Sequence, residues 1–190
     1  MINITQTWID HFASPEIENS INHFYLDGEG IVTVGIGCVV DPQKPGEFAM
    51  YRKADNGLAS MQEIGNEYSA IRQLPADREA DFYAPVCALY MMPADVVTLF
   101  SERLTEIMTD IEAQTGPMEN YPDAAQLGMA DMGLNLGPTK LRNKFPTYMS
   151  DFIAKDWPGC AAECHRLPPV PESRNAWTAA QFKSLVVRTV

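Results

Sequence analysis

The stretch from Pro122 to Gly137, PDAAQLGMADMGLNLG, most constrains the fold because its residues are apolar or small on nearly every side. A helix of this composition has no face suited to solvent and must be surrounded by other elements. Before it, from Pro93 to Gly116, apolar residues recur at helical spacing and predict a long amphipathic helix. The C-terminal half is therefore expected to be a helical bundle around a buried central helix, completed by shorter helices.

A β-hairpin is predicted over residues 25–38, YLDGEGIVTVGIGC. From Ile31 onward the residues alternate between two faces, which is the period of a strand, and Asp27-Gly28-Glu29-Gly30 has the composition of a tight turn. Upstream, Ser14 suits a helix N-cap and Pro15 the first helical position, so a short helix is expected to begin there and run toward the hairpin.

Composition narrows the possible partners. The 190 residues are 46% hydrophobic, enough to bury a core, and carry 14 Lys and Arg against 25 Asp and Glu, a net charge of −11. This charge argues against nucleic acid or an anionic membrane as partner. The chain contains neither an apolar run of membrane-spanning length nor a basic segment followed by an apolar one at its start, so neither membrane insertion nor a secretion signal is expected.

Four acids lie near the predicted hairpin: Glu16, Glu18, Asp27 and Glu29. Hydrolysis of a sugar bond needs two carboxyl groups, one protonated to serve the leaving oxygen and one ionised to activate water. A pair of acids in so acidic a chain is ordinarily solvated surface. The spacing of the acids is therefore what gives them weight.

Glu18 precedes Asp27 by nine residues, and Thr33 follows six residues later within Thr-x-Gly-x-Gly. This pattern resembles the phage-type lysozymes, muramidases in which a Glu, an aromatic residue, an Asp, a Gly and Thr-x-Gly-x-Gly recur at these intervals. The matching residues are Glu18, Tyr25, Asp27, Gly30, Thr33, Gly35 and Gly37.

The resemblance covers residues 16–37 and 93–184, where PDAAQLGMADMGLNLG and RNAWTAAQF are similar to the family's central and closing helices. It implies a mainly α, α+β lysozyme-like fold. One domain is expected in two lobes: residues 1–92, with the hairpin, and residues 93–190, helical and entered by the long connecting helix. Residues 41–92 contain one predicted helix, around 57–74, and otherwise read as an insertion of uncertain role.

The resemblance also implies the roles of single residues. Glu18 would be the general acid, Asp27 would position or activate the attacking water, and Thr33 would hold that water from the opposite face of the sugar. Such an inverting reaction needs carboxyl groups roughly 6.5 to 9.5 Å apart. Arg174 matches a family arginine that contacts the catalytic glutamate. Asn135 either contacts the substrate or caps the central helix.

The expected activity is hydrolysis of the β-1,4 bond between N-acetylmuramic acid and N-acetylglucosamine in peptidoglycan, with no cofactor and no metal. The expected partners are peptidoglycan glycan strands and an inhibitor or immunity protein, and the chain is expected to be monomeric. It would act at the bacterial cell wall or in the periplasm as an antibacterial effector, delivered by another system or as part of a larger protein.

Several alternatives stay open. Glu16 rivals Glu18 as the acid, because Asn19 follows Glu18 where the family has Gly or an apolar residue. Cys38 with His11 or His23 could form a cysteine-dependent peptidoglycan amidase. A third reading is a non-catalytic module that binds glycan or protein on the same fold.

The segment CAAECH places Cys160 and Cys164 one helical turn apart, with His165 next to them. They could hold a metal with a further ligand from elsewhere in the chain. The ordinary reading is one cysteine packed in the core and the other partly exposed.

Overall fold

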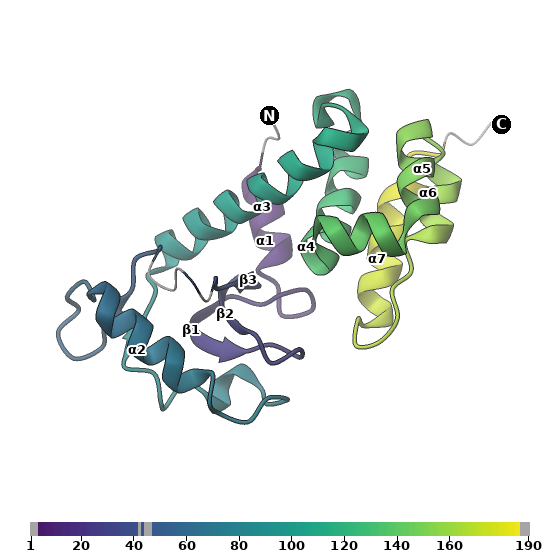
Figure 1. The fold of residues 1–190 in the computed structure, drawn as a ribbon. Helices are drawn as coiled ribbons and strands as arrows, with labels where there is room; N and C mark the ends of the chain where they lie inside the picture. The colour runs from purple at the N-terminus through teal and green to yellow at the C-terminus, as the bar shows by residue number, and fades with distance from the viewer. Residues whose placement is uncertain (1–3, 42, 44–46, 187–190) are drawn as a thin grey trace. The chain divides into compact units, whose positions relative to one another are not determined.

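The computed structural model describes residues 4–41, 43 and 47–186, and over these residues the fold is mainly α with small antiparallel sheets, as predicted (Figure 1). The chain forms two compact units. The hairpin unit is Ile9–Glu102. The helical unit is the chain from Arg103 onward together with the segment up to Trp8.

The predicted hairpin is confirmed. Strands β1 (Ile21–Leu26), β2 (Val32–Gly35) and β3 (Cys38–Val39) form an antiparallel sheet in the order β1-β2-β3. Thr33 stands opposite Tyr25 on one side and opposite Val39 on the other. The Asp27–Gly30 turn closes β1 onto β2, since the Gly30 amide donates to the Asp27 carbonyl at 2.9 Å.

The prediction that a helix begins at Ser14 is wrong. Helix α1 (Gln6–Phe12) has already ended, and the residues after it form turns in which the amides of Ile17 and Asn19 both donate to the Ser14 carbonyl. Asn19 has a φ of 63°, a left-handed conformation that a right-handed helix cannot contain. The chain reverses there into β1, so Glu18 lies at the end of a turn instead of on a helix.

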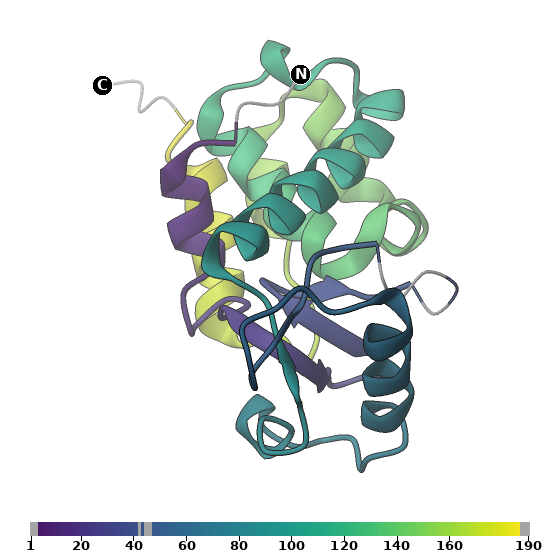
Figure 2. The same cartoon turned by 90° about the vertical axis from the view of Figure 1, so that its left-hand side faces the viewer.

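The described residues between 41 and 92 form part of the hairpin unit and contribute several buried side chains to it. The predicted helix is confirmed as α2 (Met61–Ile71), which begins with a Ser60–Glu63 capping box. It packs against β1, where the rings of Phe24 and Tyr68 meet edge to face at 6.4 Å, and Figure 2 shows it beside the sheet. The same region contributes β4 (Tyr51–Arg52), η1 (Ala80–Phe82) and β5 (Leu89–Tyr90), and β4 pairs with β5.

The predicted central helix of the C-terminal half is also confirmed. Helix α4 (Asp123–Lys144) is buried along most of its first four turns and is interrupted at Gly137, whose φ of 72° and ψ of 152° are not helical. Small residues let its neighbours approach closely, because a Cβ added at Gly128 would lie 2.6 Å from the Phe182 ring.

The other helices of the bundle are joined by short connections. The long helix α3, predicted from Pro93, spans Pro93–Thr115, and its buried residues include Leu104 and Met108. After α4 come three shorter helices, and contacts join α4 to α5 and α7 and join α6 to both α5 and α7. The remaining elements are η2 (Met118–Asn120), α5 (Pro146–Ala154), α6 (Trp157–Glu163) and α7 (Glu172–Lys183).

Candidate active site

Glu18 packs onto the second glycine of the Thr-x-Gly-x-Gly motif. A Cβ built at Gly37 would lie 2.6 Å from Glu18 Oε2 and 2.9 Å from its carboxyl carbon. Gly37 also has a φ of 61°, so its conformation favours glycine, and a side chain there would have to displace the Glu18 carboxyl group. Glu18 is half-buried, whereas its sequence rival Glu16 is exposed. Gly37 therefore leaves the space that the Glu18 carboxyl group occupies, and we call this contact with Gly37 the seat of Glu18.

Asp27 is held by the turn that it helps to close. Its Oδ1 accepts hydrogen bonds from the backbone amides of Glu29 at 2.9 Å and Ile31 at 2.8 Å. Both bonds use one oxygen, and within the described residues no hydrogen bond or ion pair involves Oδ2. Asp27 thus has a structural role through Oδ1, while Oδ2 is available to a ligand or to water.

Tyr25, Asp27 and Thr33 share one face of the sheet. Tyr25 and Asp27 are two residues apart at the end of β1, and Thr33 lies directly across from Tyr25 on β2. Thr33 is buried, and its hydroxyl donates to the Ile31 carbonyl at 3.1 Å. Because that bond uses the hydroxyl proton, the oxygen lone pairs stay able to accept a hydrogen bond from water.

Tyr25 interacts electrostatically with both predicted catalytic acids. Burial raises the pKa of its phenol, and the negative charges of Glu18 and then Asp27 raise that pKa further, with a smaller contribution from Cys38. Both carboxylates therefore act on a single hydroxyl. The sequence motif identified Tyr25 only as an aromatic residue, whereas the structure places it near both predicted catalytic acids.

The cysteine alternative has less support from the geometry. Cys38 is 3% exposed, and its thiol donates to the Ile36 carbonyl. His23 is 7% exposed, and its two ring nitrogens lie 3.3 Å from Asn22 Oδ1 and 3.0 Å from the Ala80 carbonyl. Both nitrogens are thus engaged away from a thiol, although a nucleophilic cysteine needs a free base beside it.

Arg174 and Asn135 belong to the helical unit, on α7 and α4. Arg174 is 4% exposed and donates its Nε–H to Asp131 Oδ1 at 2.8 Å. Asn135 is half-buried, within one turn of the break at Gly137. The expected contact of Arg174 with Glu18 and that of Asn135 with substrate stay predictions.

A buried ionic cluster surrounds Asp131, and the sequence analysis missed it. The Asp131 carboxylate is fully buried and binds Arg166 Nη2 at 2.7 Å as well as Arg174. Thr178 and Asn175 complete the network of hydrogen bonds. The signal was present, because one acid within an otherwise apolar, all-round buried helix requires a buried cation.

The two cysteines of the CAAECH segment are both buried, at 0% and 1% exposed for Cys160 and Cys164, so the expected partial exposure of one of them is wrong. Their i, i+4 spacing places both on the side of α6 that packs against α5 and α7. Nowhere among the described residues do three or more His, Cys, Asp or Glu side chains gather as a metal-ligand set.

In the part of the chain that the structure describes, every helix is too short or too polar to span a bilayer. Neither a protein-family model nor a curated protein matches the chain. The resemblance to phage-type lysozymes therefore stays a prediction from the spacing of Glu18 to Gly37 and from the two helical segments.

Proposed function

We propose that this protein is a muramidase that hydrolyses the β-1,4 bond between N-acetylmuramic acid and N-acetylglucosamine in peptidoglycan, with inversion. The observation that carries the proposal is the joint placement of Glu18 and Asp27. Glu18 contacts the motif glycine Gly37, and Asp27 closes the hairpin turn. The negative charges of both acids raise the pKa of Tyr25.

Glu18 is the general acid of the proposed reaction. Its carboxyl proton passes to the glycosidic oxygen as the bond to the anomeric carbon breaks. A general acid must reach that oxygen in a fixed orientation, and contact with Gly37 restricts the Glu18 rotamer. The exposed Glu16 has no such seat described for it, which favours Glu18 for this role.

Asp27 and Thr33 handle the water. Asp27 Oδ2 takes one proton from the water while the resulting hydroxyl bonds to the anomeric carbon. In each turnover Glu18 therefore gives one proton to the leaving sugar and Asp27 takes one from water. The two backbone amides on Oδ1 fix the direction of the Asp27 carboxylate. Thr33 accepts a hydrogen bond from the same water through its free lone pairs.

The chain itself is proposed to act as a monomer on glycan strands at the cell wall or in the periplasm, with an inhibitor or immunity protein as a further partner. At −11, its charge does not draw it to an anionic wall over long range. Local contacts must therefore supply the binding energy. This need is met more easily if the protein is delivered close to its substrate.

The test is digestion of purified peptidoglycan followed by mass spectrometry of the fragments. Wild type should release muropeptides with reducing muramic ends, and Glu18→Gln should lower the rate at least about 100-fold. Glu16→Gln is the matched control, since it removes a neighbouring exposed acid. Release of free peptides by wild type, and loss of that release in Cys38→Ala, would instead establish the amidase. No release by wild type would leave the binding module.

A further inference from the structure

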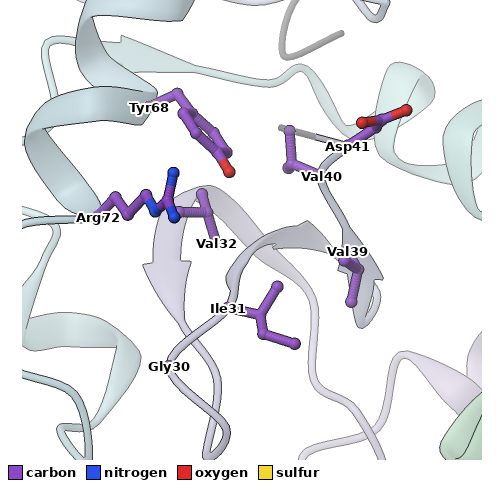
Figure 3. Close-up of a pocket in the computed structure, with 8 residues that line it drawn as sticks. All are labelled: Gly30, Ile31, Val32, Val39, Val40, Asp41, Tyr68 and Arg72. Atoms are coloured by element: carbon purple, nitrogen blue, oxygen red, sulfur yellow. The ribbon is translucent and has the colours of Figure 1, made fainter. Parts of the chain in front are cut away.

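A pocket of the hairpin unit adjoins the predicted catalytic hairpin. It has a volume of about 280 Å³ and lies between the hairpin, the residues that follow β3 and the end of α2. Its lining residues are Gly30, Ile31, Val32, Val39, Val40, Asp41, Tyr68 and Arg72 (Figure 3). Most of this lining is aliphatic, so the few polar groups decide what the pocket can bind.

Two hydrogen-bond donors point into the space above Val32: the Arg72 guanidinium and the Tyr68 hydroxyl (Figure 3). Tyr68 is 7% exposed, and its ring packs on Phe24, so the hydroxyl is held in place. Among the described residues, no side chain or backbone group hydrogen-bonds to the Tyr68 hydroxyl or pairs with the Arg72 guanidinium. Arg72 itself is exposed, and both donors are available to an acceptor carried by a ligand.

The end of the pocket opposite Arg72 carries a negative charge. Asp41 lies there, its carboxylate directed away from Arg72 and its Oδ1 accepting the Gln43 amide at 2.8 Å. The space between the two ends is walled by Val32 and Val40. The pocket therefore suits a ligand with a carboxylate at one end, a small apolar group beside it and a cation further along.

The pocket is joined to the predicted site through one residue. Ile31 lines it, while the Ile31 amide donates to Asp27 Oδ1 and the Ile31 carbonyl accepts from Thr33 Oγ1. The donors of the pocket lie on the face of the sheet that α2 covers, where Tyr68 packs on Phe24, whereas Thr33 projects from the opposite face. A ligand group in this pocket would thus adjoin the Ile31 backbone and lie across the strand from the groups proposed to hold the water.

We propose that this pocket binds the carboxylate end of a peptidoglycan peptide stem, with the terminal D-alanine carboxylate on Arg72 and Tyr68. The alanine methyl group meets the valines, and the ammonium of the preceding diamino acid lies toward Asp41. Arginine suits the carboxylate because its planar fork donates two parallel hydrogen bonds. The proposal rests on the proposed function, which makes peptidoglycan the source of the carboxylate.

Calorimetric titration with the free tetrapeptide L-Ala-γ-D-Glu-L-Lys-D-Ala tests binding directly. Wild type should bind the acid at least about 10-fold more tightly than its C-terminal amide, because a charge-assisted pair is lost in the amide. Arg72→Gln should remove this preference, and Tyr68→Phe should reduce it several-fold without disturbing the ring contact with Phe24. Arg78→Gln is the control, since Arg78 lies over the Phe82 ring outside the pocket.

Equal binding of acid and amide by wild type, or an unchanged preference in Arg72→Gln, would overturn the proposal, as would the absence of binding. Kinetics separate it from the proposed function. The ratio of kcat/KM on stem-bearing glycan to that on stem-free glycan should fall in Arg72→Gln. If wild type cleaves glycan but binds no peptide, only the pocket proposal fails. If it binds the peptide but releases no reducing ends, only the muramidase fails.

Discussion

Glu18 lies so close to Gly37 that any side chain at position 37 would collide with its carboxyl group, 2.6 Å from the position of a Cβ. The two residues are brought together by the reversal of the chain at Asn19 and by the turn that follows β2. The Thr-x-Gly-x-Gly motif therefore has a direct physical link to the predicted acid.

Gly37→Ala should lower muropeptide release about 100-fold, because the new methyl group displaces the Glu18 carboxyl from its seat. The positive φ adds about 1–2 kcal/mol of strain. Gly28→Ala is the matched control in the same hairpin, where nothing lies within 4 Å of an added Cβ. Equal activities of the two variants would contradict the seat.

Asp27→Asn should lower activity about 100-fold or more while leaving the melting temperature near that of wild type. The amide oxygen can still accept from the Glu29 and Ile31 amides, but the side chain can no longer take a proton. Asp27→Ala should lose both activity and about 1 kcal/mol per lost hydrogen bond. Thermal melts alongside the digestion assay separate the two effects, and an active Asp27→Asn would exclude Asp27 as the base.

Tyr25 should stay protonated well above pH 10, since burial and the charges of Glu18 and Asp27 raise its pKa. A raised pKa in the folded state means that its contribution to stability is complete below the unfolded pKa near 10. It is lost as the pH rises above that value. Tyr25→Phe should therefore flatten the fall in unfolding free energy above pH 10. Ultraviolet titration should show one fewer late-ionising tyrosine, and identical curves would contradict the assignment.

The cysteines should be unreactive in the folded protein. Burial raises the pKa of both Cys87 and Cys160 to about 12, so about one thiol in 10,000 is ionised at pH 8. Ellman's reagent should label native protein slowly and all four free cysteines in denaturant. A fast phase lost in Cys38→Ala would reveal an activated thiol and favour the amidase.

Asp131→Asn should destabilise the protein by roughly 3–5 kcal/mol, because it leaves Arg166 and Arg174 buried without their shared carboxylate. Asp110→Asn is the control: its pair with Arg142 is long, at 3.7 Å, and largely exposed, and such pairs contribute less than about 1 kcal/mol. Urea denaturation measures both. A small effect for Asp131→Asn would mean that the buried cluster adds little to stability.

The elements with a strong local pattern could be predicted from the sequence. The hairpin, the helix around 57–74, the long helix from Pro93 and the central helix are confirmed, because alternation, helical periodicity and turn residues act over a few neighbouring positions. The spacing from Glu18 to Thr33 also singled out the candidate acids among many, since the motif lies in one continuous stretch.

The contacts that would make those residues work were decided by tertiary structure. In place of the helix expected at Ser14, the chain forms turns and reverses at Asn19. This reversal places Glu18 in contact with Gly37. The placement of α2 on β1 created the Tyr68–Arg72 pocket in a region that had no predicted role. Local propensity carries no information about which distant side chains share a buried space. Packing and the pairing of buried charges determine that, and both depend on the whole fold.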